Sequence, residues 1–362
     1  MTSDEARENY ISEWFGHRVY PTVSSQPGAL ADQRAERCPF LSTALGESTR
    51  CVKSAASSGV CSISSRSNGR RQDWVVCPYR ALDPDLTGPV VQLLFDPQRE
   101  GVRVVPGPNL ASTAVQVEVD AALRGGSRVA ILLQDKIGGE ISLSKTDKSP
   151  EFSFDITFAE LRRSPTGIVV GDFGLMEVQT MDFHGSYRNA VKNLKDAFRL
   201  HGDGFAGAVA LNPSWLCERI EGPNISNVFK RTFYQMMLKF QVGAHDSCLG
   251  CALAIPVSVW DSWQRHLAAP TLRSEPDGTY SLYSPGRERP SKVSAWIVVF
   301  DIATRNPTPD YVSVQKVIAT DAESIAYFAL KVAPDMALGS GSFERIPLSI
   351  RARLRSWWPR IV

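Results

Sequence analysis

The stretch EFSFDITFAELRRSPTGIVVGDFGLMEVQ, residues 151–179, predicts two neighbouring β-strands joined by a turn at 162–167. Apolar and polar residues alternate in both segments, which is the period of a strand with two different faces. The alternation places Asp155 on a polar face of the first strand and puts Glu177 and Gln179 on one face of the second. Buried polar groups are costly unless something pairs with them, so these strands predict a binding site as well as a sheet.

Two carboxylates on adjacent strands repel each other unless a cation lies between them. Mg²⁺ suits such a place, because it is bound in proteins by one or two carboxylates, waters and phosphate oxygens. Asp155 and Glu177 are therefore candidate Mg²⁺ ligands for hydrolysis of a phosphodiester. Gln179 stands where a nuclease core of the Asp…Glu-x-Lys type carries its lysine. The alternative is that all three are solvated groups on an edge strand.

The chain as a whole has the composition of a globular protein. It has 362 residues, of which 43% are hydrophobic and 22% charged, and its net charge of +2 says little about nucleic acid. The polar start of the chain does not resemble a secretory signal, and no apolar run has the length of a transmembrane helix. We therefore expect a cytoplasmic protein, in which cysteines bind metal more often than they form disulfides.

Periodicity elsewhere predicts an α/β fold with a mixed central sheet flanked by helices. Helical patterns cover 113–126, 186–202 and 224–243, and buried-strand patterns cover 127–134 and 295–302. Changes in composition divide the chain into an N-terminal arm (1–36), a cysteine-containing subdomain (37–82) and a large remaining domain (83–362).

Cysteines gather in the middle of these three segments, which has little apolar periodicity. A metal would explain how such a segment folds, and thiolates suit Zn²⁺ or Fe; the alternative is a set of scattered buried cysteines. A second group, around the sequence HDSCLGC, adjoins an apolar run and favours packing over metal binding. The first group is Cys38, Cys51, Cys61 and Cys77; the second is His245, Cys248 and Cys251, with Cys217 as a conceivable fourth ligand.

Basic residues recur on one face of the helix at 186–202. Arg188, Lys192, Lys195 and Arg199 could follow DNA phosphates, although a cationic helix face is often only solvated. The sequence contains no P-loop, GxGxxG or HExxH motif, so nucleotide binding and zincin chemistry have no support.

Several stretches resemble the NotI-type restriction endonucleases, over nearly all of the chain. They include CPFL (38–41), VCPYRALDP (76–84), GGEISLSKTDKSPEFSFD (138–155), MEVQTMDFHGSY (176–187) and EGPNISNVFKRTFYQM (221–236). The resemblance implies a restriction-endonuclease-like PD-(D/E)xK core with an N-terminal four-cysteine metal-binding subdomain. It also implies a homodimer that cleaves double-stranded DNA and is paired with a cognate DNA methyltransferase in a bacterial cytoplasm.

The resemblance further implies roles for particular residues. Asp155 and Glu177 would hold Mg²⁺, Gln179 would occupy the lysine position, and Glu140 would be an additional acid. The four cysteines of the first group would form a structural Fe or Zn site. The target would be a GC-rich palindrome, either GCGGCCGC or its inner six bases CGGCCG, cut to leave 5′-phosphates.

Reading G·C pairs in the major groove requires polar side chains, with arginine or lysine as the expected partner of guanine. A non-cleaving, sequence-specific DNA-binding protein on a nuclease-like fold remains an alternative, as does a metal-bound scaffold protein. The candidate DNA-contacting residues are Lys145, His184, Ser186, Arg188, Lys192, Asn224, Ser226, Asn227, Lys230 and Arg231.

Overall fold

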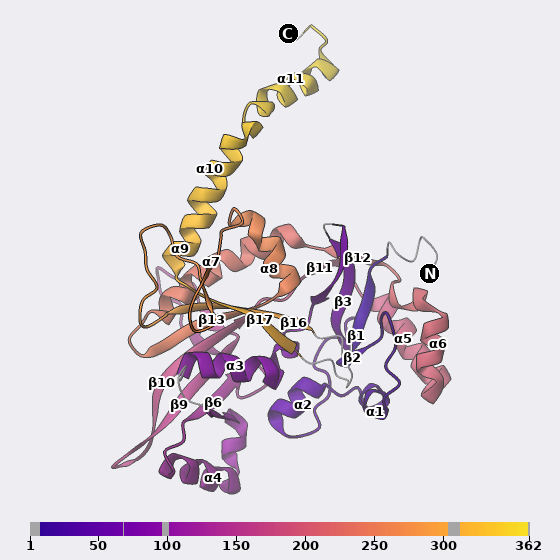
Figure 1. Cartoon of the computed structure of the whole chain (residues 1–362). Helices are drawn as coiled ribbons and strands as arrows, with labels where there is room; N and C mark the ends of the chain where they lie inside the picture. The colour runs from indigo at the N-terminus through magenta and orange to yellow at the C-terminus, as the bar shows by residue number, and fades with distance from the viewer. Residues whose placement is uncertain (1–7, 68, 96–100, 303–311, 361–362) are drawn as a thin grey trace.

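The centre of the protein is a nine-stranded mixed β-sheet with helices on both faces (Figure 1). The computed structural model describes residues 8–67, 69–95, 101–302 and 312–360. From one edge to the other the strands are β14 (Arg273–Ser274), β15 (Tyr280–Ser281), β17 (Val312–Thr320), β16 (Ala295–Ile302), β13 (Cys248–Pro256), β10 (Gly167–Val178), β9 (Ile156–Ser164), β6 (Val129–Gln134) and β5 (Arg103–Pro106). The middle strands β10, β13 and β16 run parallel, whereas β10, β9 and β6 alternate in direction.

Both faces of the sheet are buried where β10, β13 and β16 pair in parallel, as parallel strands require. Helix α3 (Pro84–Phe95) covers one face, against Met176 and Ala252. Helices α7 (Ile225–Gly243) and α8 (Val257–Trp263) cover the other face, on which Leu175 and Leu253 lie. Because successive side chains of a strand point to opposite faces, Glu177 lies on the side of α7. A smaller helix, α4 (Thr113–Arg124), packs beside β5, β6 and β9.

Helix α7 can approach the sheet closely at its C-terminal end because residue 243 is glycine. A Cβ atom there would lie 2.3 Å from the carbonyl oxygen of Ser294 and 2.9 Å from the backbone nitrogen of Cys251. Backbone atoms cannot move away as a flexible side chain can, so only glycine fits. The contact fixes where the inner face of α7 meets β13 and β10.

A second, four-stranded sheet lies beside the central one. Its order is β2 (His17–Arg18), β1 (Tyr10–Trp14), β3 (Val60–Ser67) and β4 (Arg70–Val75), with α1 (Pro27–Ala35) and α2 (Pro39–Leu45) in the connection. Helices α5 (Arg188–His201) and α6 (Phe205–Leu211) pack on it through Phe198 and Phe205 against Trp14. Strands from both sides of the predicted boundary at residue 36 therefore pair in one sheet.

Most predicted elements of the large domain are confirmed, with one informative difference. The helices at 113–126, 186–202 and 224–243 correspond to α4, α5 and α7, and the strands at 127–134 and 295–302 correspond to β6 and β16. The first strand of the 151–179 stretch, however, is not continuous: it bends at Asp155. Residues before the bend form β8 (Phe152–Phe154), which pairs with β7 (Ile141–Leu143) outside the central sheet.

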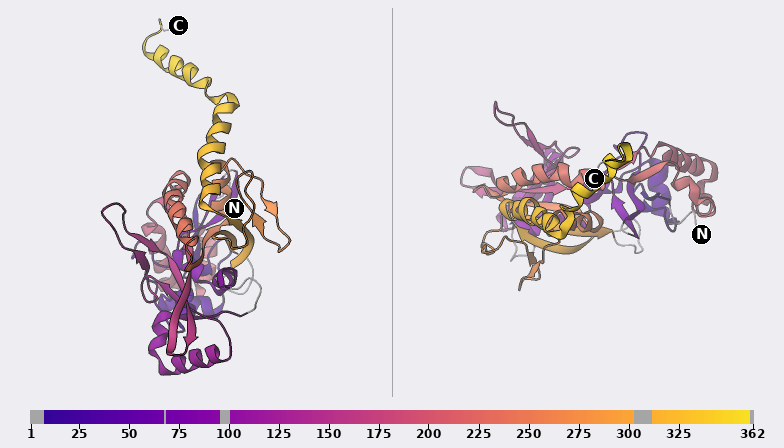
Figure 2. Two further views of the ribbon diagram at one scale, coloured as in Figure 1. Left: turned by 90° about the vertical axis from the view of Figure 1, so that its left-hand side faces the viewer. Right: turned by 90° about the horizontal axis from the view of Figure 1, so that it is seen from above.

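The chain continues beyond the central sheet in a helical arm that leaves the body (Figures 1 and 2). This C-terminal arm, residues 322–357, comprises α9 (Ala322–Tyr327), α10 (Ala333–Ala337) and α11 (Arg345–Trp357), connected by short π-helical segments. Its root, α9, packs against α7, and non-helical backbone at Gly341 separates α10 from α11. Among the described residues, none of the helices combines the length and apolar character of a membrane span.

Candidate functional site

The bend at Asp155 brings the two predicted carboxylates together. In the antiparallel register of β9 and β10, Ile156 lies opposite Met176, so that Asp155 comes next to Glu177. The backbone nitrogen of Val178 donates to Asp155 Oδ2 at 2.8 Å, and the backbone nitrogen of Asp155 donates to Glu177 Oε1 at 3.3 Å. The backbone therefore fixes the two side chains as neighbours on one side of the sheet.

A lysine from α7 completes this cluster. Lys239 Nζ donates to Glu177 Oε2, and both side chains are less than a tenth exposed. Burial raises the pKa of Glu177 well above its usual range, and the negative charge of Asp155 raises it further, against the lowering effect of Lys239. One ammonium group therefore does not balance the negative charge that collects here.

Glu140, which directly precedes β7, interacts electrostatically with the same cluster. Its side chain is exposed. Partial burial and then the negative charge of Asp155 raise the pKa of Glu140, while Lys239 acts in the opposite direction. The charge of Asp155 thus affects Glu140, and the role of Glu140 as an additional acid stays a prediction.

Gln179 is tied into helix α7. Its Oε1 accepts from the hydroxyl of Thr232, and its Nε2 donates to the carbonyl oxygen of Thr180. The Gln179 side chain therefore has a partner at each end of its amide. The positive charge of the cluster comes from Lys239, on a different element from the predicted lysine position.

A cavity opens between these groups, with about 340 Å³ of space including the part open to solvent. Its walls combine the strand ends that carry the carboxylates with the inner face of α7. The lining residues are Asp155, Glu177, Val178, Gln179, Thr232, Gln235, Met236, Lys239, Phe240 and Leu253. The site is thus a recess between sheet and helix, open enough for solvent to enter.

Lys239 and Thr232 are the site residues that sequence analysis missed. The apolar face of the helix at 224–243 includes Met236 and Phe240, and both polar residues lie on that same face. A lysine at helical spacing within an apolar stripe was the available signal, because a buried ammonium requires a partner.

Mg²⁺ is compatible with the donors of this cluster. Asp155 and Glu177 offer carboxylate oxygens in a recess with excess negative charge. No group of three or more His, Cys, Asp and Glu side chains in the described part of the chain is arranged to hold a metal ion. Mg²⁺ nevertheless requires only one or two carboxylates from the protein, because waters and phosphate oxygens supply the rest.

The predicted DNA-contacting residues fall into three places. Lys145 lies in the exposed connection between β7 and β8, and Arg188 and Lys192 begin α5 beside the second sheet. The others belong to the first turns of α7 and to strand β11 (Phe183–Gly185) with the residues that follow it: Asn224, Asn227, Lys230, Arg231, His184 and Ser186. The side chain of Ser226 lies outside the described part of the structure.

Some of these residues are brought together and others already have protein partners. His184 and Asn224 line one wide recess, with about 850 Å³ of space including open solvent, and Arg265 and His266 line it too. Arg231 forms an ion pair with Asp182 at 2.7 Å.

On α5, the predicted basic face is partly neutralised. Lys195 pairs with Glu36 at 2.6 Å, and Lys192 lies 3.7 Å from Asp196. This helix face is therefore less cationic than its sequence alone indicates.

The first cysteine group is gathered in space. The thiols of Cys61 and Cys77 are hydrogen-bonded, which raises the pKa of Cys61 and lowers that of Cys77 to about 6. Cys38 is buried, and burial raises its pKa to about 12, with smaller contributions from Cys77 and Cys51. The charges of Cys77 and Cys51 act on Cys38. The described residues include no group of three or more His, Cys, Asp and Glu side chains placed to hold a metal ion, so the four-cysteine metal site stays a prediction.

The second cysteine group is dispersed. Cys248 and Cys251 are fully buried in the core of β13, which agrees with packing. Cys217 lies elsewhere and donates to Glu8 Oε2 at 2.7 Å.

Comparison with known proteins adds no identification. No known family model matches the chain, and a search of curated proteins finds no match either.

Proposed function

We propose that the protein is a type II site-specific deoxyribonuclease that requires Mg²⁺ and cleaves both strands of a GC-rich palindrome. The observation that carries the proposal is the adjacency of Asp155 and Glu177 in a recess with excess negative charge, where the backbone N–H of Val178 holds the Asp155 carboxylate and the backbone N–H of Asp155 holds that of Glu177. Such a pair is unfavourable in the protein alone and becomes favourable once a divalent cation is bound. The resemblance to NotI-type enzymes supplies the substrate class.

In this proposal Asp155 and Glu177 hold the cation, with Glu140 available as a further acid. Bound Mg²⁺ supplies a Lewis acid that lowers the pKa of water and neutralises phosphate charge. Hydrolysis breaks the bond from phosphorus to the 3′ oxygen, so that the products are a 5′-phosphate and a 3′-hydroxyl.

In the proposed mechanism, Lys239 supplies the positive charge that the strand lacks, because Gln179 stands at the lysine position. Without metal it neutralises Glu177, and its ammonium group lies at the wall of the recess where a phosphate would enter. A fixed positive charge beside a phosphate that gains negative charge lowers the barrier of the reaction. Gln179, oriented by Thr232, presents an uncharged amide to the same recess.

Binding of the duplex is assigned to the start of α7 and the neighbouring recess. Asn227 and Lys230 are exposed there, beside the recess lined by His184 and Asn224. A palindrome read by one kind of chain implies a twofold dimer in which each site cuts one strand. In a cell such an enzyme requires a DNA methyltransferase that protects the same sequence.

The test is cleavage of linear DNA that carries one CGGCCG site, one GCGGCCGC site or a scrambled sequence, in Mg²⁺ and in EDTA. We expect discrete fragments in Mg²⁺ only, and sequencing of their ends gives the recognition length and the cut position. Specific binding without cleavage in Mg²⁺ or Mn²⁺ would instead support the non-cleaving DNA-binding protein, and neither activity would support the scaffold protein.

The cysteines carry a second, separate proposal: a structural Fe or Zn site formed by Cys38, Cys51, Cys61 and Cys77. Its support is the gathering of four thiols, three of them buried. Elemental analysis of the purified protein should find about one Zn or Fe per chain, since four thiolates complete a tetrahedral site. Cys61→Ser should lose that metal, whereas Cys248→Ser, a matched change in the other group, should keep it.

A further inference from the structure

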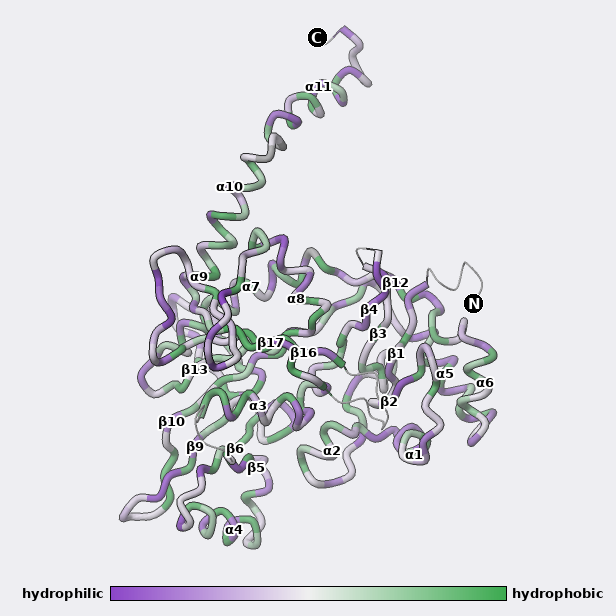
Figure 3. Tube along the Cα trace, in the orientation of Figure 1, coloured by the Kyte–Doolittle hydropathy of each residue, from purple (hydrophilic) through white to green (hydrophobic). Residues whose placement is uncertain are grey.

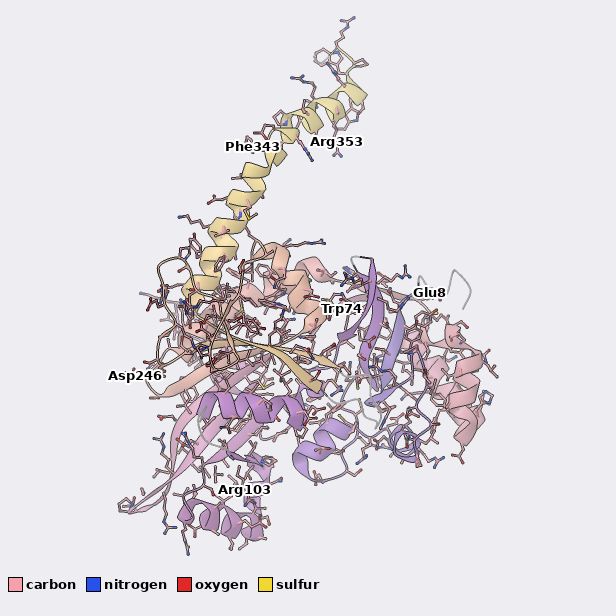
Figure 4. All side chains as sticks on the ribbon, in the orientation of Figure 1. Glu8, Trp74, Arg103, Asp246, Phe343 and Arg353 are labelled. Carbon is pink, nitrogen blue, oxygen red and sulfur yellow. The ribbon has the colours of Figure 1, made fainter. Side chains whose placement is uncertain are left out.

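The C-terminal arm carries apolar side chains that no other part of the described structure covers. All residues of α11 are exposed, with Ile350 at 54% and Trp357 at 75%, and so is Phe343 just before it. Figure 3 shows hydrophobic and hydrophilic segments alternating along the arm, and Figure 4 shows Phe343 and Arg353 on a helix away from the body. An exposed apolar surface of this kind marks a place of interaction.

Four apolar residues of α11 and Phe343, just before it, form one stripe. Successive members are separated by three, four, four and three residues, which at 100° per residue keeps them within about 40° of Ile350. The stripe is Phe343, Ile346, Ile350, Leu354 and Trp357. Four arginines lie outside it, at positions 345, 351, 353 and 355. Helix α11 thus has a narrow apolar face between basic flanks.

The spacing of this stripe is symmetric about its own centre. Turning the helix end for end about Ile350 exchanges Phe343 with Trp357 and Ile346 with Leu354. A twofold contact between identical chains requires a surface that is complementary to its own copy after a rotation of 180°. We propose that the stripe of α11 binds the same stripe of a second copy of this chain, with the two helices antiparallel.

Charge placement is compatible with this pairing. In the antiparallel alignment Arg351 comes level with Ser349 of the second copy, and Arg353 comes level with Pro347. Arg345 and Arg355 point away from the stripe, since they lie about 140° from Ile350 around the helix. No arginine therefore faces another arginine across the contact.

The area available is of the size that a dimer needs. Phe343 and Trp357, with the three aliphatic side chains of the stripe, offer roughly 350 to 550 Å² of apolar surface per arm at their present exposures. A standard interface contributes roughly 450 Å² of apolar surface from each partner. Because α9 packs on α7, pairing of two arms also joins two copies of the recess in one assembly. The inference itself stands on the arm and does not depend on nuclease activity.

The test is the mass of the full chain in solution, by light scattering and sedimentation from 1 to 50 µM. We expect a dimer for the wild type and a monomer for Ile350→Glu, which places two carboxylates opposite each other at the twofold axis, with a dissociation constant raised at least 100-fold. Leu348→Glu is the matched control, because Leu348 is equally exposed at 59% but lies about 160° around the helix. This control should remain dimeric.

Three results would overturn the proposal: a monomeric wild type, a dimer unaffected by Ile350→Glu, or equal loss of the dimer in both variants. A monomeric wild type that binds vesicles of anionic lipid, with binding lost in Ile350→Glu, would show that the stripe serves a membrane surface instead. The mass is measured without DNA, so a monomeric wild type would not decide the outcome of the cleavage experiment.

Discussion

Two buried carboxylates of this protein have opposite electrostatic surroundings. Asp32 in α1 and Glu177 in β10 are 2% and 7% exposed. Burial alone would raise both pKa values. At Asp32 the hydrogen bonds from His17, at 2.7 Å, and from Arg37 outweigh burial, and the pKa is lowered. At Glu177 burial and Asp155 together outweigh Lys239, and the pKa is raised.

The difference separates a structural charge cluster from a candidate functional one. Around Asp32 the chain supplies enough positive and donor groups to stabilise the carboxylate, and the surroundings are packed. Around Glu177 the chain leaves negative charge unbalanced beside an open recess. Active sites are where such destabilising arrangements persist, because a ligand that binds there relieves them.

The largest effect is expected at Asp155. Asp155→Ala should lower cleavage by on the order of 10³-fold or more, since it removes a cation ligand at the reacting phosphate. DNA binding should remain, and Mg²⁺ should no longer raise the thermal unfolding temperature. Asp172→Ala, at an exposed ion pair elsewhere on β10, is the control and should cleave normally. Full activity of Asp155→Ala would end the assignment of the site.

Asp32→Asn should change stability but not chemistry. It breaks a buried, hydrogen-bonded charge cluster, which typically costs about 3 to 5 kcal/mol of unfolding free energy. Because the pKa of Asp32 is lowered in the folded state, its stabilisation is present above the unfolded value of about 3.8 and is lost as pH falls through the folded value. Urea unfolding should therefore show a larger difference between the variant and the wild type at pH 7 than at pH 3.

Lys239→Met should separate cation binding from catalysis. Without the ammonium group, Mg²⁺ no longer competes with a fixed cation at Glu177, so calorimetric titration should show tighter binding. Cleavage should nevertheless fall by about 10²-fold, because charge on the phosphate is less well neutralised. If Lys239 only supported packing, its substitution would lower Mg²⁺ affinity and cleavage together.

A second change sharpens this test. Gln179→Lys in the Lys239→Met background returns one positive charge to the recess from the strand. Cleavage should then recover by about tenfold or more, whereas Gln179→Met in the same background should give no recovery.

The smallest effect is expected on the basic face of α5. Lys192→Gln should weaken DNA binding less than tenfold and reduce the slope of log affinity against log salt by about 0.9, as for one phosphate contact. An unchanged slope would show that Lys192, which lies 3.7 Å from Asp196, is only a solvated charge.

The local sequence pattern was sufficient to predict most helices and strands named above and part of the candidate site. Alternation in the second half of β10 determined which of its residues face α3 and which face α7, because successive side chains of a strand point to opposite faces of the sheet. The same alternation placed Glu177 and Gln179 on one face. The bend at Asp155 could not be predicted this way, because the pairing of β8 with β7, outside the central sheet, draws the chain out of its alternation.

What the sequence determined by itself is the α/β layering, the helical stripes and the two carboxylates on neighbouring strands, since each follows from residue periods of 2 and 3.6. Only the tertiary structure decided that the ammonium group beside Glu177 comes from Lys239, 62 residues further along the chain. It also decided that no other described residues cover the stripe of α11. Both depend on which surfaces meet, and such long-range contacts are set by packing of the whole chain rather than by any local pattern.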